Sequence, residues 1–248
     1  MPTFLHGKNT AVYIDEFDLT SYFTSTSTTV QTDLAETTSY AASAKTYIKG
    51  LRTGSVSASG LWAQDTDGSD EELQAILGSA ALVTIREGSA AIGGSAVLAR
   101  VNETTYSISN PVSDISAISC EFQCTPGTVS NLTFALAQGV QLTAGASIAH
   151  GSLGALSSVD NAASSANGGA ATLHVPTNTV NGNTTIKVQH SANDSSWADL
   201  ISFTAVGSSA KTSEIKAVSG TVNRYLRVSA STAGSSGSIT FMVAAARF

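Results

Sequence analysis

The chain has 248 residues, enough for one large domain or two ordinary ones with a buried core. Charged residues make up only 12%, about half the usual share in globular proteins, and Ser, Thr, Ala and Gly fill the difference. The net charge of −6 excludes an overall attraction for nucleic acid or an anionic membrane, and no apolar run approaches the roughly 18 residues needed to span a bilayer. The N-terminal residues lack the basic-then-apolar order of a secretory signal, so we expect assembly inside a cytoplasm.

The first half of the chain is predicted to form short strands. Period-2 alternation or β-branched runs mark strands at 10–14, 53–62, 81–86, 95–101 and 115–125, with another extended piece after Leu19. Residues 33–45 follow neither a strand period nor a helix period and are predicted to form a long loop. Loops of this length in compact domains are usually functional or cover a neighbour.

One short helix is predicted after residue 68. Ser69 is placed to cap it, with Glu72 three residues later as a capping box, and Gly78 is placed to end it. Its buried stripe is expected to consist of Leu73, Ile76 and Leu77.

The composition changes after Gly139. Residues 145–169 are rich in Ala, Ser and Gly with Asp160 as their only charge, so 139–169 is predicted to be a connecting segment, loose from 157 onward. A second β unit is expected at 170–248, or from near 140, with strands at 184–190, after Trp197, at 215–217, 226–228 and 239–243. Ile201, Phe203 and Ala205 are expected on one face of the strand after Trp197.

The predicted fold class is therefore all-β: two β-sandwich or half-barrel units, the first (1–138) with one short flanking α-helix. No alternation of strands and helices supports an α/β fold.

The cysteines and histidines do not predict a metal site or a cofactor. Cys120 and Cys124 lie about 13 Å apart on an extended strand, too far for a disulfide. With Ile118 and Phe122 they alternate onto one face, so both thiols are predicted to belong to the core. The histidines lack ligand spacing; they are His6, His150, His174 and His190.

No sequence motif indicates an enzyme, and we predict no catalytic residue. The acidic stretch 65–72 resembles a calcium loop, but Gly68 is fourth rather than sixth and Ile76 occupies the twelfth position, where a bidentate Glu is needed. Nucleotide-binding loops and a nucleophile elbow are absent from the sequence. Trp197, His190 and Tyr225 could form a sugar-stacking platform, although packing on the sheet is the commoner role for such a Trp.

The order of these parts in the first 135 residues resembles the major tail protein of siphophages. The matching segments are Gly7-Lys8-Asn9-Thr10, Asp18-Leu19-Thr20-Ser21-Tyr22, the loop at 35–40, the segment 44–51, the strand 54–62 and the acidic helix start. The resemblance implies subunits that join their sheets into a closed ring, commonly hexameric, and rings that stack into a hollow tail tube.

The resemblance also assigns partners and a location. The loop would reach toward a neighbouring subunit or ring through Asp33, Leu34, Ala35, Glu36, Thr37, Thr38, Ser39, Tyr40 and Lys45. The implied partners are further copies of the chain, in hexameric or trimeric rings, and other phage tail proteins; no membrane is involved. DNA would pass through the lumen without specific binding, so we expect a neutral or acidic lumen, because cationic walls would hold phosphate. The implied location is the virion tail, assembled in the host cytoplasm.

The second unit resembles accessory β-sandwich modules of phage virion proteins, in the segments 188–197 and 223–227. The single-domain tube protein lacks such a module. Three alternatives therefore stay open: a capsid decoration protein, a head–tail connector, or a sugar-binding phage adhesin.

Overall fold

The computed structural model describes residues 4–125 and 136–248 of the chain. Strands take up 55% of the chain, and α1 (Ser69–Ile76) is the one α-helix of the described part, so the predicted all-β class is confirmed. The strands form a 12-stranded and a 4-stranded antiparallel sheet. No helix in the described ranges is long and apolar enough to cross a membrane.

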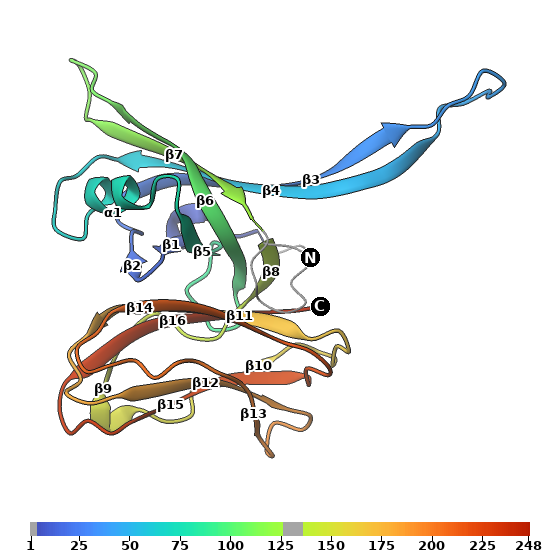
Figure 1. Cartoon of the computed structure of the whole chain (residues 1–248). Helices are drawn as coiled ribbons and strands as arrows, with labels where there is room; N and C mark the ends of the chain where they lie inside the picture. Colours follow the sequence, from blue (N-terminus) through green and yellow to red (C-terminus); the bar gives the residue numbers. More distant parts are fainter. Residues whose placement is uncertain (1–3, 126–135) are drawn as a thin grey trace.

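The first unit consists of two packed layers, the upper half of the molecule in Figure 1. The inner layer contains β1 (Ala11–Ile14), β2 (Phe17–Asp18), β5 (Ala80–Arg86) and the first half of β6 (Ser95–Ser109). The outer layer contains β3 (Phe23–Glu36), β4 (Tyr47–Leu61), β7 (Ala117–Cys124) and the second half of β6. Leu19, Leu73 and Phe122 lie in the core between the layers. Cys120 is buried beside Phe122 and Cys124 is half-buried, as the alternation predicts.

The second unit is a sandwich, the lower half of Figure 1. One sheet contains β11 (Gly169–Asn178), β14 (Thr212–Val218) and β16 (Ser238–Arg247), with β9 (Ser147–Ala149) on the edge of β16. The other is formed by β10 (Val159–Asp160), β12 (Thr184–Ser191), β13 (Ala198–Ser202) and β15 (Tyr225–Thr232). Leu173, Ile186 and Phe241 fill the space between them. The predicted strands after 184 are all present, but Ala205 is exposed whereas Ile201 and Phe203 are buried.

The two units share a continuous sheet. β8 (Leu136–Gln141) pairs with β6 on one side and with β16 on the other. Gly139 permits this close approach, because a Cβ there would lie 2.3 Å from the Ala245 carbonyl oxygen. A small apolar layer lies between the units and contains Ala11, Tyr13, Ala96, Leu98, Met242, Ala244 and Ala246. The division of the chain at 138 and 169 stays a prediction.

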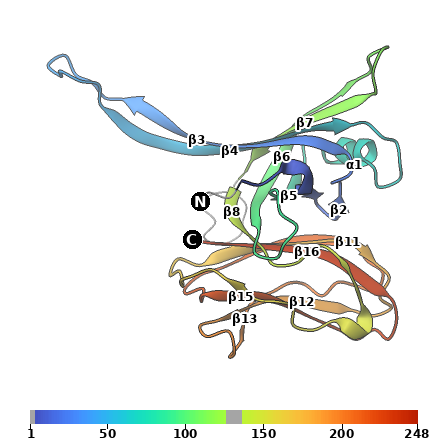
Figure 2. The same ribbon diagram turned by 180° about the vertical axis from the view of Figure 1, so that it is seen from behind.

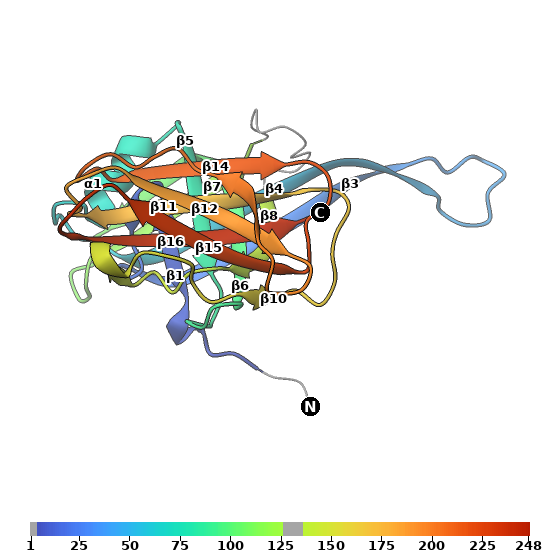
Figure 3. The same cartoon turned by 90° about the horizontal axis from the view of Figure 1, so that it is seen from below.

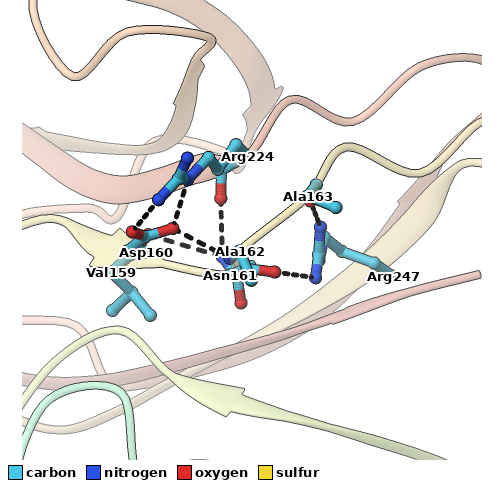
Figure 4. A network of polar contacts seen from close by, with 7 residues as sticks. All are labelled: Val159, Asp160, Asn161, Ala162, Ala163, Arg224 and Arg247. Carbon is cyan, nitrogen blue, oxygen red and sulfur yellow. Dashed lines mark hydrogen bonds and ion pairs between the residues drawn. The ribbon is translucent and has the colours of Figure 1, made fainter.

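The segment predicted as a connection is held in place by arginines, shown in Figure 4. Arg224 donates from Nε and Nη2 to the two carboxylate oxygens of Asp160, both at 2.6 Å. Arg247 donates to the carbonyl oxygens of Asn161 and Ala163. Two short strands, β9 and β10, also lie inside this segment. Composition alone could not reveal these contacts, because the partners lie more than sixty residues away in the sequence.

The start and the buried face of the helix differ from the prediction. Gly68 is the N-cap, while the Ser69 hydroxyl is buried and donates to the Leu61 carbonyl oxygen at 3.2 Å. Glu71, rather than Glu72, reaches back to accept the backbone N–H of Asp67 at 3.2 Å. Leu77 lies after the last helical turn and is 49% exposed, so the buried stripe is narrower than expected.

Candidate assembly surface

The residues predicted to contact a neighbour lie at the end of a long hairpin instead of in a loose loop. β3 continues through Asp33, Leu34, Ala35 and Glu36, and only residues 37–46 form the connection to β4. The loop prediction for 33–45 is therefore wrong for its first four residues. Their irregular pattern comes from a bulge between Thr32 and Leu34, which breaks the two-residue period.

The outer half of this hairpin has no core of its own. It projects from the body of the molecule in Figures 1, 2 and 3, and every residue from 33 to 53 is exposed. Several of these side chains are large and apolar: Leu34, Tyr40, Tyr47, Ile48 and Leu51. A two-stranded ribbon is marginally stable in water without a surface to pack against. The exposed apolar groups therefore indicate an interaction surface.

The tip of the hairpin is closed by its own polar contacts. Thr37 and Thr46 share a backbone hydrogen bond of 2.8 Å and a hydroxyl contact of 3.1 Å. Lys45 pairs with Glu36 at 3.1 Å, but both side chains are well exposed, so this pair contributes little stability. Tyr40 projects fully into solvent.

The outer face of the β3–β4–β7–β6 sheet is polar and almost uncharged. Opposite residues on neighbouring strands share a face of a sheet, and in the central part of this sheet the register aligns twelve side chains on the face turned away from the core. We call them the serine-rich face: Ser25, Ser27, Thr29, Ser55, Ser57, Ser59, Asn102, Thr105, Ser107, Ser119, Glu121 and Gln123. Glu121 is the only charged member, and neither Lys nor Arg is among them.

Both long edges of this four-stranded sheet are open over the described residues. β3 pairs with β4 alone. On the opposite side, pairing of β5 with β6 ends at Asn102, and beyond it only Leu77 bridges to Glu103. Residues 104–109 of β6 therefore have a β7 neighbour on one side only. Open edges of this length are available to pair with strands of another chain.

Carboxylates form an acidic surface at the start of α1. The helix itself lies on the opposite side of the first unit from the hairpin (Figure 1). The pKa of Glu72 is raised to about 7, first by burial and then by the nearby carboxylates of Asp67, Glu71 and Glu16. Lys211 of the second unit pairs with Asp67 and lies 5.1 Å from the Phe17 ring. This contact links the acidic surface to the second unit.

A buried polar chain also connects the two units. His174 is fully buried, and its Nδ1 contacts the Asp15 carbonyl oxygen, which can only accept, so Nδ1 carries the proton. Nε2 therefore accepts from the Thr84 hydroxyl at 2.7 Å, and Thr84 in turn contacts the Thr172 hydroxyl at 2.9 Å. Burial lowers the pKa of His174 to about 4.

This histidine predicts an acid-sensitive stability. Because the folded-state pKa lies below the ordinary value of 6.5, unfolding takes up a proton between pH 6.5 and 4. The contribution is present above pH 6.5 and is lost as the pH falls through that range, by up to about 3 kcal/mol. Urea unfolding at several pH values between about 4 and about 7 measures this effect. The unfolding free energy of wild type is expected to fall more steeply with falling pH than that of His174→Gln. Parallel pH profiles of the two proteins would contradict the prediction.

The three residues considered for sugar binding do not form one stacking platform. The Trp197 ring is covered on one face by the Arg227 guanidinium at 4.1 Å, and the Tyr225 ring by Arg224 at 5.0 Å. His190 accepts the Asn223 backbone N–H at Nδ1, and burial lowers its pKa. The arginines were not part of the predicted sugar site. Arg227 lies between Leu226 and Val228, which face inward, so strand alternation could have placed it on the outer face.

Comparison with known proteins gives a partial structural likeness. No protein-family model matches the sequence, and a search of curated proteins finds no match. Among solved structures, a chain of a native gene transfer agent virion is similar over 49% of this chain and 95% of its own, at 16% identity and a TM-score of 0.42. A chain from the tail of an empty gene transfer agent particle with C6 symmetry is similar over the same shares, at 17% identity and a TM-score of 0.39.

Proposed function

We propose that this protein is a structural, non-enzymatic subunit of the tail tube of a long-tailed phage or phage-like particle. Copies join through the open edges of the β3–β4–β7–β6 sheet, so that β3 of one copy pairs with residues 104–109 of β6 in the next. Six or three copies close a ring, and rings stack into a tube. The open four-stranded sheet is the observation that carries this proposal.

In a closed ring, both open strand edges of each copy are paired with neighbouring copies. An open edge promotes uncontrolled pairing, and a rotationally symmetric head-to-tail contact satisfies every edge without leaving a free end. The hairpin then extends over a neighbouring copy. Its exposed apolar side chains pack there against that copy; they include Leu34, Ile48 and Leu51. Each of these contacts requires a second copy of the chain.

The serine-rich face suits a DNA conduit. In a closed ring it faces the lumen, because the opposite side of the same sheet is filled by the core with Val56, Ala58 and Phe122. Hydroxyl groups with one carboxylate, Glu121, offer no cation to phosphate. DNA is therefore not retained through counterion release, and can slide.

Electron microscopy of the concentrated purified protein tests the proposal. Stacked rings or tubes, with a matching rise in mass by light scattering, are the expected result. A protein that stays monomeric at every concentration and is absent from purified particles would overturn it.

A further inference from the structure

The 4-stranded sheet of the second unit is the layer farthest from the β3–β4–β7 layer that carries the serine-rich face (Figures 1 and 2). Its inner side is buried through Ile186, Val188, Leu226 and Val228. Its other side is half-exposed and carries polar side chains. If the serine-rich face lines a channel, as the proposed function requires, this outer side faces the surroundings of the particle.

One arginine on this outer side is held in a fixed orientation. The Arg227 guanidinium stacks on Trp197 at 4.1 Å, and its Nε donates to Gln189 Oε1 at 2.9 Å. Gln189 is itself fixed, because its Nε2 donates to Asp199 at 2.8 Å. The Asp199 carboxylate pairs with Lys187 at 2.6 Å, and so its charge is already compensated.

Arg227 has no acidic partner among the described residues, and no hydrogen bond within them uses its two terminal nitrogens. A guanidinium that is stacked and oriented loses little side-chain entropy when it binds an anion. The terminal nitrogens form a planar fork that matches a carboxylate.

A second arginine, directly before β15, makes the same kind of arrangement with a carboxylate already bound. Arg224 also stacks on an aromatic ring, that of Tyr225 at 5.0 Å, and it holds the carboxylate of Asp160 through two nitrogens at 2.6 Å. None of the described residues supplies to Arg227 the carboxylate that Asp160 supplies to Arg224. The matching external group is a carboxylate.

We propose that Arg227 and Trp197 bind a carboxylated sugar unit of an acidic polysaccharide. The guanidinium fork takes the sugar carboxylate, and the half-exposed indole offers its remaining apolar surface to the ring. Gln189 and Asp199 are positioning residues. General attraction of a polyanion is opposed by the net charge of −6, so binding has to come from this local arrangement.

Calorimetric titration of the full-length protein with oligogalacturonate, and with its methyl ester, tests the inference. We expect the wild-type protein to bind oligogalacturonate. The affinity is expected to fall at least about tenfold in Arg227→Gln, because one charge-assisted contact is lost. Trp197→Ala and methyl esterification of the ligand are expected to weaken the affinity to a similar extent. Arg227→Lys is expected to weaken it less. Lys8→Gln, which removes an equal charge outside the site, is expected to bind as wild type does. Thermal melts establish that each variant is folded.

Two results would overturn the inference: no binding at millimolar oligogalacturonate, or binding that Arg227→Gln and Arg227→Lys leave unchanged. Equal affinity for oligoglutamate would overturn the assignment to a sugar. Rings or tubes without glycan binding would refute this inference alone, whereas a protein that forms no rings would refute the tail-tube proposal whatever it binds.

Discussion

Replacing residues 33–51 by Asn-Gly is expected to give a folded monomer that no longer assembles. Thr32 and Arg52 are opposite each other in the β3–β4 register, so a two-residue type I′ turn can join them. The deleted residues are all exposed, so the melting temperature is expected to change by no more than a few degrees. Size-exclusion chromatography with light scattering and electron microscopy measure the loss of rings.

A matched control distinguishes the effect of removing the hairpin from the effect of removing its charged tip. Glu36→Gln with Lys45→Gln removes the exposed ion pair at the tip and keeps the hairpin. This variant is expected to assemble as wild type does, because such a pair contributes about 0–1 kcal/mol. Full assembly of the truncated protein would show that the hairpin does not contact a second copy.

Glu103→Gln is expected to stabilise the protein above neutral pH by up to about 3 kcal/mol. Glu103 is 1% exposed, and neither carboxylate oxygen has a hydrogen-bond partner among the described residues. It lies opposite Phe122 on the core side of β6. Burial raises the pKa of Glu103 from 4.5 to about 7. Burial, and after it the nearby charge of Glu103, raise the pKa of the Cys120 thiol to about 12.

Glu103 and His174 change the stability in opposite directions as the pH rises. A raised carboxyl pKa means that the folded protein keeps a proton that the unfolded chain releases between pH 4.5 and 7, so stability falls as the pH rises through this range. The histidine contribution rises between pH 4 and 6.5. Between pH 4.5 and 6.5 the two effects on the unfolding free energy offset each other in wild type. The effect of His174 becomes visible in Glu103→Gln, and the effect of Glu103 in His174→Gln.

Urea unfolding at about pH 4.5 and about pH 8 measures the Glu103 effect through this linkage. The expected difference between Glu103→Gln and wild type is small at the lower pH and large at the higher pH. A difference independent of pH would indicate that Glu103 has a partner in the folded protein and an ordinary pKa.

Sequence periodicity predicted the strands whose two faces differ. Ile118, Cys120 and Phe122 alternate with exposed polar residues, and the structure buries them as predicted. The same holds for Ile186 and Val188 in β12. Alternation is informative here because one face meets the core and the other meets solvent.

The central strand β11 was not predicted. It is buried on both faces by the sandwich core and by the first unit, so its sequence Gly-Ala-Ala-Thr-Leu-His-Val has no alternation. His174 in this strand could not be recognised as buried, because its partners Asp15 and Thr84 come from the other unit. Sequence reasoning therefore missed the contacts that link the units.

The outer part of β4 was also not predicted as a strand: the predicted strand begins at 53, whereas β4 begins at Tyr47. Residues 47–52 contain exposed Ile48 and Leu51 beside Lys49 and Arg52, a pattern without a buried face. In the proposed assembly a neighbouring copy supplies that face, and a single sequence does not contain this information. The serine-rich face became recognisable only once the register aligned four strands.

A cryo-EM map of assembled particles, or of tubes grown from the purified chain, tests strand pairing between copies most directly. The expected map shows β3 of one copy hydrogen-bonded to residues 104–109 of the next, with Ser57, Ser119 and Glu121 toward the lumen. A map in which both strand edges stay unpaired, or in which lysines and arginines line the channel, would contradict the account.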